Sequence, residues 1–183
     1  MAPFLAFSRT VDWISAQFGR LADWMVLAAC LISAGVAALR YSNLATPSNA
    51  WLEIQWYLFA GVVMLGAAYT LRRNEHVRVD ILYGWVAPRT RHWIDIFGMV
   101  VFLLPAMVLL AWMTWPFFIE SWMRNEVSGN AGGLIRWPVK FLLPLGFALM
   151  TVQGLSELIK RIALLRGQAP AGEVVAEYVR PEQ

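Results

Sequence analysis

Four long apolar runs constrain the fold of this 183-residue chain more than any other feature. They cover about residues 24–41, 51–71, 93–118 and 138–159, and each is flanked by Trp, Tyr or Arg. A helix needs about 20 apolar residues to cross roughly 30 Å of hydrocarbon, and interfacial aromatic residues are typical of such helices. We therefore predict an all-α membrane protein with four transmembrane helices, forming a single domain over residues 1–166.

The distribution of basic residues predicts the orientation of these helices. Of the 15 Lys and Arg residues, eleven lie in the N-terminal segment, in the loop between the second and third runs, and in the C-terminal segment. Cytoplasmic loops carry an excess of Lys and Arg, so both termini and the middle loop are expected in the cytoplasm. Topology accounts for the net charge of +3, and no nucleic-acid partner is expected.

Three further segments have recognisable patterns. Residues 4–21 carry apolar residues at helical spacing, which predicts an amphipathic helix that lies on the cytoplasmic membrane surface or packs against a partner helix. Residues 77–86 predict a short interfacial helix between the second and third spans. Residues 167–183, rich in Pro, Gly and acids, predict a flexible cytoplasmic tail. Pro105, near the middle of the third run, predicts a kink there.

The apolar layer offers little chemistry. A membrane enzyme, or a transporter with its own pathway, needs ionisable groups at membrane depth. Asp95 follows Arg91 by four residues and Glu157 precedes Arg161 by four, so each acid is expected to form a local ion pair near a helix end. No serine has a nucleophile-elbow context and no pair of carboxylates lies at membrane depth. We predict that the chain is not an enzyme and has no catalytic residue.

No cofactor or metal site is predicted either. The two histidines, His76 and His92, lie in the polar middle loop, which excludes a haem held by histidines from facing helices. Glu75, His76 and Asp80 are possible metal ligands by residue type, but a solvated charge cluster at a membrane interface is the favoured interpretation. The single cysteine, Cys30, lies inside the first apolar run and cannot form a disulfide framework.

Two stretches resemble a known family. Residues 75–83 (EHVRVDILY) and 91–95 (RHWID) resemble the signature of the small membrane subunit, the DctQ-like subunit, of tripartite ATP-independent periplasmic (TRAP) transporters. The resemblance covers about residues 21–166. Residues 132–140 (GGLIRWPVK), leading into 144–147 (PLGF), are similar to the branch described as mannitol/chloroaromatic or 2-oxo acid type.

This resemblance implies a three-part importer in the bacterial inner membrane. A periplasmic solute-binding protein captures an organic acid, and a large membrane subunit, here a separate chain, carries it inward with sodium. The small subunit is then a scaffold that stabilises the large, elevator-type subunit. Because the sodium and substrate sites belong to the large subunit, the resemblance agrees with the lack of ionisable groups at membrane depth.

Two sets of charged residues are the candidate contact sites. On the cytoplasmic side, they are expected to bind phospholipid phosphates or carboxylates of the large subunit. These residues are Arg72, Arg73, Glu75, His76, Arg78, Asp80, Arg91 and Asp95. On the outer side, candidates for contacting the binding protein are Arg124, Arg136 and Lys140, for which ordinary interfacial anchoring is the alternative interpretation.

A different class of function is an independent small exporter of four helices that acts as a dimer. Such a protein needs an essential acid within the membrane. Glu53 is the nearest candidate, although it lies at the mouth of the second predicted helix.

Overall fold

The computed structural model describes residues 2–42, 48–76 and 86–168 of the chain. The elements are α1 (Ala2–Tyr41), α2 (Asn49–Arg73), α4 (Pro88–Gly98), the π-helical segment η1 (Met99–Leu103), α5 (Leu104–Met123) and α6 (Trp137–Leu165). Within the described residues, four helical stretches are long and apolar enough to cross a membrane, and no strand is formed. The prediction of an all-α protein with four such helices is confirmed.

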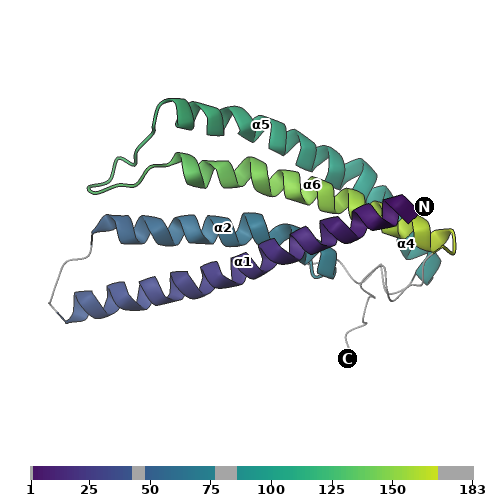
Figure 1. The fold of residues 1–183 in the computed structure, drawn as a ribbon, viewed down its shortest axis with the longest axis horizontal. Helices are drawn as coiled ribbons and strands as arrows, with labels where there is room; N and C mark the ends of the chain where they lie inside the picture. Colours follow the sequence, from purple (N-terminus) through teal and green to yellow (C-terminus); the bar gives the residue numbers. More distant parts are fainter. Residues whose placement is uncertain (1, 43–47, 77–85, 169–183) are drawn as a thin grey trace.

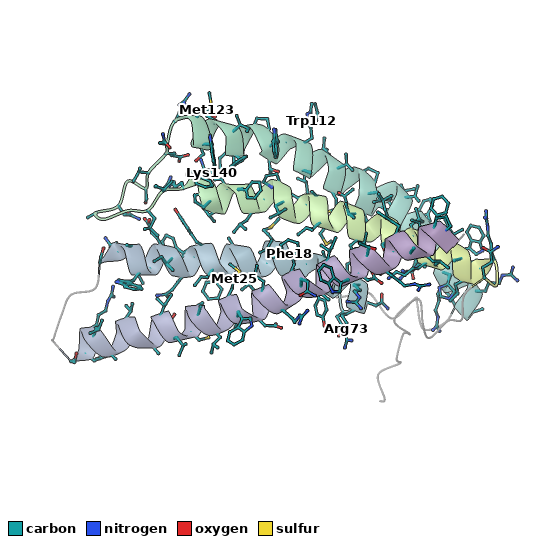
Figure 2. All side chains as sticks on the ribbon, in the orientation of Figure 1. Phe18, Met25, Arg73, Trp112, Met123 and Lys140 are labelled. Atoms are coloured by element: carbon teal, nitrogen blue, oxygen red, sulfur yellow. The ribbon has the colours of Figure 1, made fainter. Side chains whose placement is uncertain are left out.

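The long helices lie in a row. Figure 1 shows the order α5, α6, α2 and α1 across the layer, and the main contacts join these neighbours in turn. The N-terminal part of α1 then crosses α6. Because α5 lies at one edge, many of its large apolar side chains are exposed; Trp112 and Met123 point away from the layer in Figure 2 and are 74% and 76% exposed. The arrangement is an open layer with apolar faces, in contrast to a closed bundle around a central core.

The amphipathic helix predicted over residues 4–21 is not a separate element, which corrects that prediction. It is the first half of α1, whose 40 residues form one helix of about 60 Å. Its buried face includes Ser8, Val11 and Ser15, whereas Phe4 is 56% exposed. The polar side chains of this half find partners on α6, so the helix continues straight across α6 without a break.

The third spanning stretch is irregular next to Pro105, where the sequence predicts a kink. The irregularity takes the form of η1, in which the Leu104 N–H donates to the Met99 carbonyl, five residues back. Proline has no N–H to complete the normal pattern, and a wider π-helical turn is one of the known ways in which a helix accommodates such a break.

Local signals fix the ends of α2. The Ser48 hydroxyl accepts a hydrogen bond from the Ala50 N–H at 3.3 Å, which caps the first turn. The helix stops at Asn74, whose φ of 60° is left-handed and whose N–H donates to the Leu71 carbonyl. The interfacial helix predicted over residues 77–86 begins just beyond this point. It lies almost wholly outside the described residues, as does the tail from residue 169, and both remain predictions.

Helices α2 and α6 approach each other closely at Gly146. A Cβ atom added there would lie 2.7 Å from both the Cβ atom and the carbonyl oxygen of Met64. A backbone oxygen cannot turn aside as a flexible side chain can. Small residues at contacts between membrane helices serve this purpose, since they let the two backbones come close.

Replacing Gly146 with alanine is expected to push α2 and α6 apart and to lower the free energy of unfolding by about 1–3 kcal/mol. The matched control is Gly35→Ala in α1, where no atom lies within 4 Å of the added Cβ. That change should be neutral or slightly stabilising, because alanine favours a helix over glycine by up to about 1 kcal/mol. Thermal unfolding of both variants in detergent tests this, and equal melting temperatures would contradict it.

Candidate functional site

Helix α6 carries a stripe of buried polar residues toward its C-terminal end. Gln153, Ser156, Glu157, Lys160 and Arg161 are each at most 5% exposed. Their spacing of three and four residues places them on adjoining faces of the helix. Buried charges require partners, and each of these side chains has one in a neighbouring helix or within α6.

Lys160 is the central cation of this stripe. Its ammonium group donates to both carboxylate oxygens of Asp12 in α1, at 3.2 and 3.1 Å. It also donates to the carboxylate of Glu157, one turn earlier in α6. A single ammonium thus pairs with two carboxylates, of which Glu157 has only 3% of its side chain exposed.

Neutral polar groups complete the contact between α1 and α6. The Gln153 amide donates to Asp12 at 2.9 Å and to Glu157 at 3.0 Å, and its carbonyl oxygen accepts from the Ser15 hydroxyl at 2.7 Å. The Ser8 and Ser156 hydroxyls each donate to the other residue's backbone carbonyl. Together these hydrogen bonds fix the rotation of α1 about its axis and its register along α6.

Two arginines extend the network to the other helices. Arg161 donates to Asp95 in α4 and to Glu157, in both cases at 3.1 Å. Arg72, at the end of α2, donates to the Asp12 backbone carbonyl at 2.9 Å, and its Nε atom lies 4.0 Å from the Asp12 carboxylate.

We call this group the charge network: Asp12, Arg72, Asp95, Glu157, Lys160 and Arg161. It contains three acids and three bases, so it is neutral as a whole. At 1.5 Å per residue, Lys160 lies about 35 Å from the start of α6, which is close to the far boundary of a hydrocarbon layer of about 30 Å. The network therefore joins α1, α2, α4 and α6 near one membrane surface.

At the opposite end of the layer, Glu53 binds the loop between α5 and α6. It lies in the second turn of α2 and is 3% exposed. Its carboxylate accepts from the Asn130 amide at 2.7 Å, from the Leu134 backbone N–H at 2.8 Å and from the Ser128 hydroxyl. The exporter hypothesis depends on Glu53, and the carboxylate of this residue already accepts hydrogen bonds from three donors in the loop.

A second acid orders the same loop. Glu126 forms ion pairs with Lys140 and, at 3.4 Å, with Arg136. The Lys140 ammonium also lies 4.0 Å from the centre of the Phe117 ring, and Figure 2 shows this side chain at the loop end of α6. The pKa of Glu126 is lowered to about 2, most by the hydrogen bond from Lys140, and Ser121 and Arg136 contribute in the same direction.

Because the pKa of Glu126 is lowered, the loop is expected to lose stability in strong acid. Ionised Glu126 stabilises the fold fully above its ordinary pKa of 4.5, and this contribution is lost as the pH falls through about 2. Lys140→Met is expected to raise the pKa of Glu126 toward 4.5, whereas Lys140→Arg should keep it low. Carboxyl NMR titration of glutamate-labelled protein measures this, with Glu126→Gln to assign the resonance. A pKa that stays near 2 in Lys140→Met would refute the pairing.

The cytoplasmic candidate residues do not form one cluster. Arg72 and Asp95 both belong to the charge network, but Arg72 pairs with Asp12 and Asp95 pairs with Arg161. Arg73 pairs with Glu75 at 3.4 Å in an exposed contact, and His76 is exposed. The Arg91 Nε atom donates to the Val86 carbonyl at 2.9 Å. Arg78 and Asp80 lie outside the described residues, so their proposed role remains a prediction.

The outer candidates separate into two kinds. Arg136 and Lys140 are both tied to Glu126 within the loop, which gives each a structural role. Arg124 pairs with Glu120 at 2.8 Å, but 76% of its side chain is exposed. Of the three, Arg124 presents the most accessible cation.

Sequence reasoning missed the pairing of Asp12 with Lys160. It found the local pair of Glu157 with Arg161, which is confirmed at 3.1 Å, but it did not anticipate that Asp95 pairs with Arg161 in α6. A usable signal was present. Ser8, Asp12 and Ser15 form one polar stripe at helical spacing, and Gln153, Ser156 and Lys160 form another, each in a helix that is otherwise apolar.

Among the described residues, no group of three His, Cys, Asp or Glu side chains is arranged to hold a metal ion.

The family model described as "Tripartite ATP-independent periplasmic transporters, DctQ component" matches residues 38–164. These residues run from the end of α1 to the end of α6 and include every member of the charge network except Asp12. No match is found among curated proteins or solved structures.

Proposed function

Since this chain belongs to the DctQ component family of tripartite ATP-independent periplasmic transporters, we propose that it is the membrane scaffold of a three-part importer. In this proposal it holds a separate large membrane subunit, which carries an organic acid inward with sodium. A periplasmic solute-binding protein delivers the acid. The chain itself contributes no transport site.

The observation that carries the scaffold role is the open layer of helices. A closed bundle buries the apolar faces of its helices against one another. A single layer leaves apolar side chains exposed on its helices, as with Trp24 in α1 and Trp112 in α5. Large contiguous apolar surfaces mark sites for other proteins or for lipid. A flat apolar layer suits a subunit that lies against a larger membrane protein.

The state of the charged groups supports the same role. The six ionisable side chains of the charge network pair with one another, and the carboxylate of Glu53 is filled by loop donors. Groups that bind and release ions during transport need free coordination positions and access to solvent. Groups that are paired throughout suit a rigid support.

The bacterial inner membrane is the proposed location, with both termini and the middle loop in the cytoplasm. The excess of Lys and Arg in those segments supports this orientation. It puts the charge network at the cytoplasmic surface and the Glu53 loop at the periplasmic surface, where the binding protein would dock.

Reconstitution tests the proposal directly. Liposomes that contain this chain, the large subunit and the binding protein should take up an organic acid when a sodium gradient is applied. Omission of this chain should abolish uptake or the recovery of intact large subunit. Transport by the chain alone in liposomes would overturn the scaffold role and support the exporter hypothesis. Glu53→Gln further separates the exporter hypothesis from the scaffold proposal. An exporter would lose transport completely, whereas a three-part importer containing the variant would keep its uptake as long as the variant folds.

A further inference from the structure

A cavity lies between α4 and the end of α6, and neither the charge network nor the loop uses it. Its volume is about 330 Å³. The lining residues are Arg89, Trp93, Ile96, Ile162, Leu165 and Arg166. We call it the α4–α6 groove.

The groove is built by two matching helical faces. Arg89, Trp93 and Ile96 follow one face of α4, and the three lining residues of α6 follow another at spacings of three and one. The ion pair of Asp95 with Arg161, at 3.1 Å, fixes the two helices against each other about one turn away. The geometry of the groove is therefore set by the charge network.

The two arginines of the groove differ from those of the network. Arg89 and Arg166 are both exposed, and neither forms an ion pair or a side-chain hydrogen bond within residues 2–42, 48–76 and 86–168. Two exposed guanidinium groups beside an apolar floor attract an anion that also has an apolar part.

We propose that the α4–α6 groove binds the phosphate headgroup of an anionic phospholipid. The guanidinium groups of Arg89 and Arg166 donate to the phosphate oxygens, as arginine does in bidentate phosphate recognition. Basic pockets between membrane helices at the cytoplasmic surface are suited to such headgroups. This inference depends on the membrane location of the chain and not on its role in transport.

The apolar surface beyond the groove suits the acyl chains. Trp93 is 58% exposed and lies near the start of the third spanning stretch, where tryptophan is typical of the membrane interface. Phe97 in α4 is 61% exposed, and Val100 in η1, which follows α4 directly, is 47% exposed. A phospholipid would occupy both parts, since its phosphate meets the arginines and its acyl chains lie along the apolar surface beside them.

Binding of short-chain phospholipids to the full chain in detergent tests the proposal. Dihexanoyl phosphatidylglycerol is expected to bind about tenfold more tightly than dihexanoyl phosphatidylcholine, measured by native mass spectrometry. The double variant Arg89→Gln/Arg166→Gln should lose this preference. The control, Arg9→Gln/Arg20→Gln, removes the same charge from exposed residues of α1 and should keep it.

Further measurements distinguish a phospholipid from free phosphate and from a protein partner. Inorganic phosphate should bind much more weakly than phosphatidylglycerol, and equal binding would overturn the lipid proposal. Loss of preference in the control variant would show a general charge effect and would also overturn it. If the groove variant keeps its lipid preference but releases the large subunit, the groove is a protein contact and the proposal is wrong. Unchanged thermal unfolding verifies that the groove variant folds.

Discussion

Lys160→Met is expected to lower the free energy of unfolding by about 3–5 kcal/mol, the cost of breaking a buried ion pair from one side. The change leaves Asp12 without its closest cation and leaves Glu157 with Arg161 as its remaining ion-pair partner. Both the ammonium and the Glu157 carboxylate are almost fully buried, so water cannot replace the lost partner. Equilibrium unfolding of the purified chain in mixed micelles measures the effect.

The double variant Glu157→Gln/Lys160→Met provides the control for this prediction. It removes one charge of each sign, so no buried carboxylate is left without a cation: Asp95 keeps Arg161 and Asp12 keeps Arg72. Most of the lost stability should return, because the penalty comes from the unpaired charge and not from the missing ion pair itself. A double variant less stable than Lys160→Met would refute this explanation.

The second large effect is expected at the other end of the layer. Glu53→Leu removes the acceptor of three hydrogen bonds and leaves the Leu134 N–H and the Asn130 amide without it. Hydrogen bonds to charged groups contribute about 1.5–3 kcal/mol each, and part of this returns when the loop opens to water. A net loss of about 2 kcal/mol in loop stability corresponds to about 30-fold faster exchange of the Leu134 amide hydrogen.

Amide hydrogen exchange of the loop measures this change, and Glu120→Gln is the matched control. Glu120 also pairs with a loop residue, Arg124, but 61% and 76% of their side chains are exposed. An exposed pair of this kind contributes at most about 1 kcal/mol. Similar exchange in Glu53→Leu and Glu120→Gln would show that Glu53 does not anchor the loop.

The spanning helices could be predicted because they depend on local composition. Each apolar run is long enough to cross the hydrocarbon layer, and a helix in lipid must satisfy its backbone hydrogen bonds internally. The helix ends were less predictable. Residues 4–21 read as a separate amphipathic helix because of their polar residues, and whether Ser8 and Asp12 continue a long helix depends on partners about 148 residues away.

Pairing between helices was not predictable, since it depends on how each helix is rotated. Glu157 and Arg161 share one face of α6 by their spacing alone, so their ion pair followed from the sequence. The pair of Asp95 with Arg161 requires that α4 and α6 present these residues to each other. Likewise, Glu53 was correctly placed near the start of a helix, but its bonds to the distant loop were not visible.

The contact between Asp12 and Lys160 has a consequence for biosynthesis. The two residues lie 148 positions apart, so at about 5–20 residues per second roughly 7–30 s pass between their synthesis. During that interval the Asp12 carboxylate has no lysine partner, and α1 cannot take its final position on α6. Closure of the network therefore follows the synthesis of α6. A chain that stops before α6 lacks this neutralising contact, which distinguishes an incomplete product from a finished subunit before any partner binds.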